Sequence, residues 1–263
     1  MAENIEYQTV AGPVIESGFV GYVRSAQVPD DPSDLLPRTR CRLLSADREQ
    51  GRAAMRLDLP AGYQRAAGPI ATGSIDLVVL AGSLAFGTEL LGPRDFAFVP
   101  SGCVAPEIGS AGGATVLLFV DPPPPAERIA AQQALGAFVT RYHEDAWSEP
   151  SLVRNAGLEL DLAIQMLKAD PATTARTWYV RQGAGGKVPW ERHSVVEEGF
   201  LMSGDYRLAE RLPARAVIGD YEPGGYFRRP PGVLHSGPES GTATGAIWLQ
   251  RSPAALDVEF FSD

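Results

Sequence analysis

The chain has 263 residues, of which 44% are hydrophobic and 21% charged, and its formal net charge is −9 at pH 7. This composition is typical of a globular protein with a buried core, and an acidic chain without a basic stripe is a poor match for nucleic-acid phosphates. No apolar run approaches membrane-spanning length and no signal segment is visible, so we expect a cytoplasmic protein without a nucleic-acid or membrane partner.

Turn-forming residues are frequent, with 28 glycines and 22 prolines. Because both are unfavourable inside helices, they favour an all-β fold. Residues 1 to about 38 are predicted to be irregular. The two cysteines, Cys41 and Cys103, form no CxxC pair, which argues against a disulfide framework or a thiolate metal site.

Strand patterns then recur at close spacing. Two strands around a polar turn are predicted by "TRCRLLSADREQGRAAMRLDLPAG", and a hairpin is predicted by "SIDLVVLAGSLAFG". Further strands are predicted by "RDFAFVPSG" and "ATVLLFVDP". Short strands at this spacing are typical of a sandwich or barrel.

A proline run interrupts this pattern in "DPPPPAERIAAQQALGAFVTRYHED". Four successive prolines do not fit a central strand, so the run marks a boundary. A short helix is predicted in "AERIAAQQALGAF". We assign residues 121–155 to a proline-rich connector between two halves.

The sequence after the connector repeats the sequence before it. The segment "GDYEPGGYFRRPPGVLHSG" corresponds to "LLGPRDFAFVPSGCVAPEI", and "ATGAIWLQ" corresponds to "ATVLLFV". Such a repeat indicates two similar β-domains. We place them at residues 1–120, with an extended N-terminal arm, and at residues 156–263.

Four polar residues of the second half form a candidate site. Glu191 and His193 are two residues apart, so on a strand they point to the same face. Glu197 begins the next apolar run, and His235 follows the turn in "RRPPGVLH". Two imidazoles with one or two carboxylates suit a divalent cation such as Fe, Mn, Ni or Zn.

These residues also have structural interpretations. His193 and His235 can be core or turn histidines, and Glu197 can be an exposed hairpin charge. Glu191 can bind a metal, act as a general base, or be a solvated charge.

The third histidine and several charged residues are interpreted as surface or packing residues. Glu198 is expected to face solvent, and His143 is expected to be a surface or packing residue. Arg228 and Arg229 are interpreted as surface charges, with the alternative that they hold an anionic substrate.

The spacing of the candidate site resembles the first motif of the cupin family, which is Gly, five residues, His-x-His, three or four residues, Glu, six residues, Gly. Gly185, Glu191, His193, Glu197 and Gly204 match that spacing, with Glu191 in place of the first His.

The second cupin motif is Gly, five residues, Pro-x-Gly, two residues, His, three residues, Asn. Gly224, Pro230, Gly232 and His235 match it, with Glu239 in place of the final Asn. The amino-acid sequence of the second half is most similar to the cupin branch that includes anti-sigma-factor sensor domains and aromatic-ketone dioxygenases. The organisation in two copies resembles that of bicupins.

The resemblance implies an all-β fold of two tandem cupin barrels (double-stranded β-helix, or jelly roll) with one divalent metal per chain. It makes His193, Glu197 and His235 ligands, with Glu191 as a fourth ligand or a catalytic base. Fe(II) is favoured, and Zn, Mn or Ni are alternatives.

The first half matches only the scaffold of the family, so we expect no metal there. Ala105 stands where His235 stands, Gly68 and Ile70 occupy the first pair, and Ser74 or Ile75 replaces the glutamate.

The resemblance implies a metal-dependent enzyme acting on a small molecule. An oxygenase for a carbonyl or for an enolic or phenolic substrate is ranked first. An isomerase or cyclase and a non-catalytic metal-binding sensor module are the alternatives. A homodimer is expected because such folds often pair through sheet edges, and strands of the N-terminal arm can reach a second chain.

Overall fold

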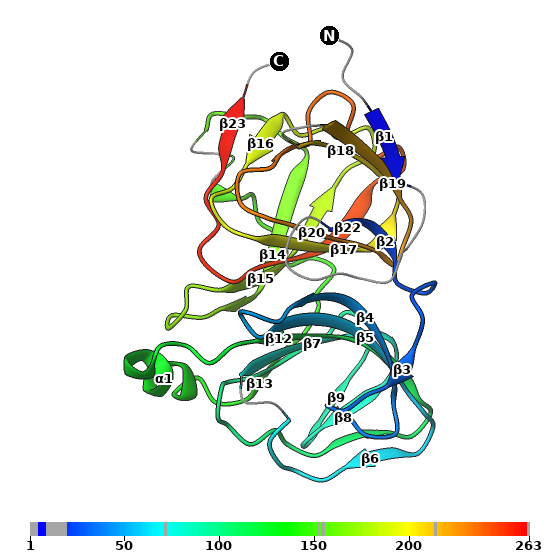
Figure 1. Ribbon diagram of the computed structural model, residues 1–263, viewed down its shortest axis with the longest axis vertical. Coiled ribbons are helices and arrows are strands. Elements are labelled where there is room, and N and C mark those ends of the chain that lie inside the picture. The colour runs from blue at the N-terminus through cyan, green and yellow to red at the C-terminus, as the bar shows by residue number, and fades with distance from the viewer. Residues whose placement is uncertain are drawn as a thin grey trace.

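The computed structural model describes residues 5–8, 20–70, 73–151, 153, 156–212 and 215–261, and its regular structure is almost entirely β-strand (Figure 1). The predicted helix is present as α1 (Ala126–Gln133). The strands form four sheets, two in each half of the chain. The β fold is therefore confirmed, but hydrogen bonds among the described residues do not close these sheets into barrels.

The first half folds into two sheets that pack face to face. A core between them includes Leu57, Val79, Leu84 and Ile108. One sheet has the order β13-β10-β7-β12-β5-β4-β3, and the other has the order β6-β11-β8-β9. The strands are β3 (Asp31–Pro32), β4 (Arg40–Asp47), β5 (Arg52–Leu59), β6 (Tyr63–Arg65), β7 (Ser74–Gly82), β8 (Leu84–Phe86), β9 (Glu89–Leu91), β10 (Phe96–Val99), β11 (Ile108–Ser110), β12 (Ala114–Asp121) and β13 (Phe138–Thr140).

The second half repeats this arrangement. Its sheets have the orders β14-β15-β22-β17-β20-β2 and β1-β19-β18-β21-β16-β23, and Trp178, Leu208 and Trp248 belong to the core between them. The strands are β1 (Ile5–Gln8), β2 (Val20–Arg24), β14 (Leu162–Ala169), β15 (Arg176–Gln182), β16 (Trp190–Arg192), β17 (Glu197–Gly204), β18 (Tyr206–Leu212), β19 (Arg215–Tyr221), β20 (Gly225–Arg229), β21 (Leu234–His235), β22 (Ala246–Ser252) and β23 (Glu259–Phe261).

The described strands of the N-terminal arm pair with both halves of their own chain, and one of them, β3, pairs with β4 of the first half. In the second half, β1 pairs with β19 and β2 pairs with β20. The sequence predicted an irregular arm here, whose strands could reach a second chain. β13, in the predicted connector, pairs with β10 of the first half. Local sequence could not predict these pairings, because the partner strands lie far away along the chain.

The predicted hairpin at "SIDLVVLAGSLAFG" is wrong, because its two strands belong to different sheets. Gly82 ends β7 with φ +76°, and a Cβ there would collide with the carbonyl of Gly113. Gly204 ends β17 with φ +87° and meets Gly245 in the same way. The two glycines let the backbone turn from one sheet into the other, and their equivalence supports the predicted internal repeat.

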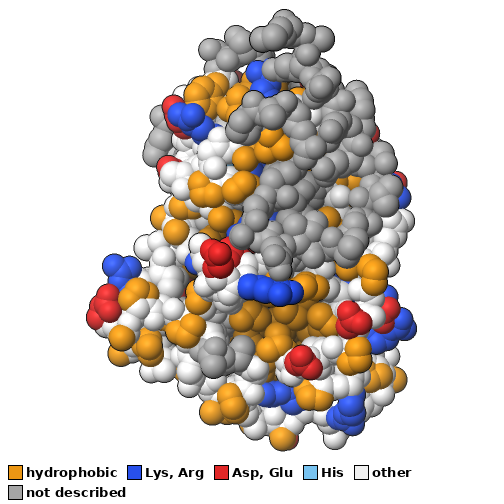
Figure 2. Space-filling view, viewed as in Figure 1, with side chains coloured by type: hydrophobic (Ala, Val, Ile, Leu, Met, Phe, Trp, Pro, Cys, Tyr) orange, Lys and Arg blue, Asp and Glu red, His pale blue; other side chains and the backbone are white. Residues whose placement is uncertain are grey.

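The two halves pack through the sheet that contains β7 and β12 and the sheet that contains β15 and β17. Phe98 and Phe119 of the first half share an apolar cluster with Tyr179 and Phe200 of the second. The visible face in Figure 2 shows the lysine and arginine side chains dispersed among acidic ones, and the described residues form no continuous basic stripe there. The described helix is too short to cross a membrane.

Buried ion pairs also join the halves. Lys168 Nζ lies 2.5 Å from Asp76 Oδ1, with both side chains 1% exposed. Arg228 pairs with Asp47 at 3.2 Å, and Arg251 pairs with Asp121 of the first half while also donating to Glu198 of its own half at 2.6 Å. The expected solvent-facing positions of Glu198 and Arg228 are therefore wrong. Both side chains lie on the sheet face that packs against the first half.

We predict that Asp76→Asn lowers the free energy of unfolding by about 3–5 kcal/mol, because it removes the carboxylate in direct contact with the buried Lys168 ammonium. Urea denaturation measures this change. The control is Asp220→Asn, which breaks an exposed pair with Arg207 and should change the free energy by less than about 1 kcal/mol. Equal effects of the two substitutions would contradict the role of the buried pair.

Candidate metal centre

The site is built from two facing sheets of the second half. In one sheet Glu191 of β16 and Glu210 of β18 are both cross-strand partners of His235 on β21, so these three side chains form a row. In the other sheet Glu197 of β17 and Arg229 of β20 are cross-strand partners. The pleat of each sheet directs these side chains into the space between the sheets.

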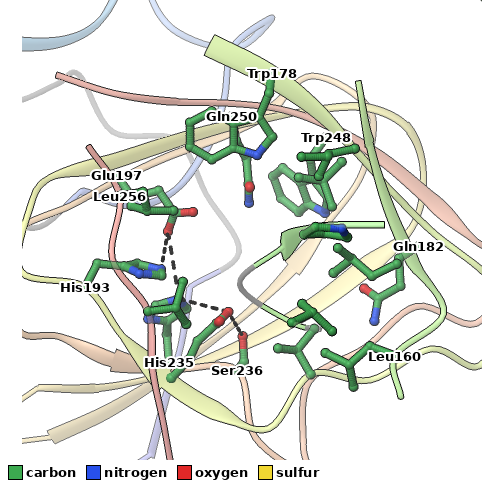
Figure 3. Close-up of a pocket in the computed structure, with 18 of the residues that line it drawn as sticks. Leu160, Trp178, Gln182, His193, Glu197, His235, Ser236, Trp248, Gln250 and Leu256 are labelled. Atoms are coloured by element: carbon green, nitrogen blue, oxygen red, sulfur yellow. Dashed lines mark hydrogen bonds and ion pairs between the residues drawn. The ribbon is translucent and has the colours of Figure 1, made fainter. Parts of the chain in front are cut away.

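The predicted ligand atoms converge there (Figure 3). His235 Nε2 lies 3.3 Å from Glu191 Oε1 and 3.8 Å from Glu197 Oε2, and His193 Nε2 lies 3.5 Å from the same Glu197 oxygen. One ligand atom each from Glu191, His193 and His235 can be chosen so that all three lie within 4.8 Å of one another. The structure thus brings together the residues that were predicted from widely separated segments.

Backbone carbonyls set the tautomer of both imidazoles. His193 Nδ1 is 2.6 Å from the carbonyl oxygen of Asp257, and His235 Nδ1 is 3.1 Å from that of Val233. A carbonyl oxygen only accepts a hydrogen bond, so Nδ1 carries the hydrogen in each neutral ring. Both Nε2 lone pairs therefore face the centre, as a metal site requires.

Arg229 lies beneath this cluster rather than on the surface, where it was expected. Its guanidinium donates to the carboxylates of Glu197 and Glu210, and it stacks 4.4 Å from the ring centroid of Phe227. Its side chain is 3% exposed. These bonds hold Glu197 in place beside the histidines.

The electrostatics of the cluster favour a cation. Burial would raise the pKa of Glu191, but a hydrogen bond from His235 and the positive charges of His235 and His193 in their protonated forms, together with Arg229, hold it below its ordinary value. Burial raises the pKa of Glu210 despite the neighbouring Arg229. When both imidazoles are neutral, the carboxylates of Glu191, Glu197 and Glu210 outnumber the single guanidinium of Arg229, and a divalent cation would balance the difference.

A cavity of about 160 Å³ opens beside the cluster. A cavity of about 150 Å³ is enough to hold benzene, so this one suits a small ring compound. Its lining is mostly apolar, with a few polar groups between the apolar ones. The lining residues include Leu162, Ile164, Trp178, Val180, Gln182, Val188, Tyr206, Leu208, Phe227, Trp248, Gln250, Leu256 and Val258.

The other residues considered in the sequence lie outside the metal cluster. His143 is an exposed residue of the connector, as expected. The bridge between Gly68 and Ala105 in the first half corresponds to the pairing of Glu191 with His235, so the positions aligned by the repeat are structurally equivalent but lack ligand side chains. Glu210 was missed because no local pattern distinguishes it from a surface charge.

No protein-family model matches the chain, and no curated protein matches it. Solved structures do match. A "putative dioxygenase" from Nostoc punctiforme has a TM-score of 0.66 and 14% identity, covering 94% of this chain and 87% of that one. Oxalate decarboxylase from Bacillus subtilis, in a deletion mutant, has a TM-score of 0.60 and 13% identity, covering 95% and 81%. Oxalate decarboxylase from Lactobacillus farciminis has a TM-score of 0.61 and 13% identity, covering 94% and 90%.

These structures are cupin-type proteins, so the similarity supports the fold that the two sequence motifs imply. At 12–14% identity the similarity shows the fold alone.

We predict that Arg229→Met lowers the free energy of unfolding by about 3–5 kcal/mol, because Glu197 and Glu210 lose their buried counter-charge. Combining it with Glu197→Gln and Glu210→Gln should restore part of that loss. Urea denaturation of metal-free protein measures both effects. A triple variant no more stable than Arg229→Met would contradict the assigned pairing.

Proposed function

We propose that the protein is a metal-dependent enzyme whose metal is held by His193, His235 and Glu191. The observation that supports this most directly is the convergence of two Nε2 lone pairs and one carboxylate at the end of an apolar cavity. Two histidines and a carboxylate with open positions are typical of non-haem Fe(II) oxygenases. Fe(II) is therefore the favoured metal, with Mn, Zn and Ni as alternatives for the same donors.

The proposed reaction is dioxygenation of a small carbonyl compound in its enolic or phenolic form. Both oxygen atoms of O2 enter the organic product, so the reaction consumes no external reductant. The volume and apolar lining of the cavity suit such a substrate. The lining includes Arg176 and the buried Arg229, but its mostly apolar remainder would make the desolvation of a small dianion such as oxalate costly.

The chain's own residues hold the reacting groups in place. When bound, the metal would supply Lewis-acid and one-electron chemistry at this end of the cavity. Glu191, whose Oε1 accepts a hydrogen bond from Ser236 at 3.2 Å, would complete the ligand set. Glu197, oriented by Arg229, lies close enough to the histidines to serve as a further ligand or to accept a proton from the substrate hydroxyl.

We also infer that the protein is a bicupin whose two jelly-roll halves have different roles. The second half would carry the metal and the cavity. The first half, with Gly68 and Ala105 at the equivalent positions, would support the outer face of the sheet that carries Glu197 and Arg229.

Removal of either histidine should remove the metal. We predict that His193→Ala and His235→Ala each lose at least about 90% of the metal bound by wild-type protein, since each removes a ligand. His143→Ala is the matched control, because it changes the remaining histidine and should keep the wild-type content. Elemental analysis of protein purified without added metal measures this. Equal metal in all three variants would end the proposal.

Oxygen uptake tests the reaction class. With Fe(II) and a panel of enolic 1,3-diketones and phenolic ketones, the wild-type protein should consume O2 in a 1:1 ratio with one of them and without a reductant. Glu197→Gln should keep the metal and slow turnover by about 10²–10⁴-fold if it accepts the proton. Bound metal with no O2 uptake, but with conversion of a panel compound, would instead indicate an isomerase or cyclase.

A further inference from the structure

Two glutamine side chains in the cavity have unused hydrogen-bonding capacity. Gln182 is 4% exposed and lines the cavity together with Gln250, and neither amide makes a hydrogen bond to any described residue. Some polar side-chain atoms of the described residues are both inaccessible and without a hydrogen bond, including atoms of Arg229 and Trp147. No atom of Gln182 or Gln250 is among them. Their amides are therefore reachable from the cavity.

Strand register explains why these amides face inward. On β15 and β22, Trp178 is paired with Gln250, Val180 with Trp248, and Gln182 with Ala246. These alternate residues share the face of the sheet that lines the cavity. Gln250 lies nearer the metal ligands, across from Gly199 on β17. In Figure 3 Gln182 lies on the side away from His193 and His235.

The loop after β15 passes close to Gln182. A Cβ on Gly186 would come within 2.6 Å of Gln182 Cγ and 3.0 Å of its Nε2, and also within 2.8 Å of the carbonyl oxygen of Gly183. Only a glycine therefore allows the loop after β15 to pass so close to this amide.

Another buried glutamine shows how this fold satisfies an amide that has a structural role. Gln165 is 5% exposed, and its Nε2 donates to the carbonyls of His143 at 2.9 Å and Ala146 at 3.3 Å. Its oxygen accepts from the backbone N–H of His143. The Gln182 amide has no such partner in the described protein and borders the cavity instead, so its hydrogen-bonding groups are available to a ligand there.

We propose that Gln182 binds a neutral hydrogen-bonding group, such as a carbonyl, carboxamide or hydroxyl, at the end of the substrate remote from the metal ligands. The apolar body of the substrate would lie against Trp178, Val180 and Trp248. A carboxamide offers both donors and an acceptor but no charge, so it suits a neutral polar group better than a carboxylate. This inference deepens the proposed function and rests on the same cavity.

A stability comparison tests whether Gln182 has a structural role. Gln182→Met keeps the length of the side chain and breaks no hydrogen bond within the protein, so the urea midpoint should stay the same or rise. Gln165→Met should lower the midpoint, because it leaves backbone groups of His143 and Ala146 unpaired. A fall for Gln182→Met as large as that for Gln165→Met would overturn the inference.

A pair of probes of equal size tests the ligand class. Benzamide and α-methylstyrene differ mainly in replacing the carboxamide by an apolar group. Wild-type protein should bind benzamide at least tenfold more tightly, because the apolar probe leaves the amide unpaired. Gln182→Met should abolish or reverse this preference, and Gln165→Met should keep it. Calorimetric titration measures both constants.

An unchanged preference in Gln182→Met, or no benzamide binding by wild-type protein at millimolar concentration, would overturn the subsite. Metal content measured on the same samples separates the two proposals. If metal is bound and Gln182→Met keeps the preference for benzamide, only the subsite proposal is rejected. If the protein binds no metal and Gln182→Met reverses the preference, the subsite is supported and only the metal-dependent function is rejected.

Discussion

The alternation of side chains along β17 and β20 is the constraint on which the site depends. Glu197 and Arg229 face each other across these strands and point toward the cavity, whereas the next cross-strand pair, Glu198 and Arg228, points toward the first half. One sheet therefore serves two buried polar systems, one on each face. A slip of one residue in this pairing would exchange them, placing interface charges in the cavity and metal-site charges in the interface.

This constraint gives the first half a function although it carries no ligands. Asp47 pairs with Arg228, and the hydroxyl of Ser45 lies 3.2 Å from Glu198 and 2.6 Å from the hydroxyl of Tyr226. These bonds hold the outer face of the sheet whose inner face carries Glu197 and Arg229. The carbonyls of Asp257 and Val233 orient the two histidines on the opposite side of the cavity, so the site is pre-organised without a bound ligand.

Much of the fold was predictable because its signals are local. The turns, the proline run and the repeated strand pattern predicted an all-β chain in two similar halves, and motif spacing brought His193 and His235 together across the sequence. The pairing of β2 with β20 was not predictable, because nothing near "GFVGYVR" specifies so distant a partner. The burial of Arg229 and Glu198 was missed because charged residues are usually exposed, and only three-dimensional pairing shows why these are not.

The central claim is that His193, His235 and Glu191 hold one metal ion in the second half. A crystal structure of protein purified without added metal, with diffraction recorded on both sides of the iron absorption edge and the corresponding edges of manganese, nickel and zinc, tests it most directly. We expect one anomalous peak within about 2.0–2.3 Å of both Nε2 atoms and of a Glu191 oxygen. A peak elsewhere in the molecule, or electron density for water alone between the two imidazoles after metal loading, would contradict it.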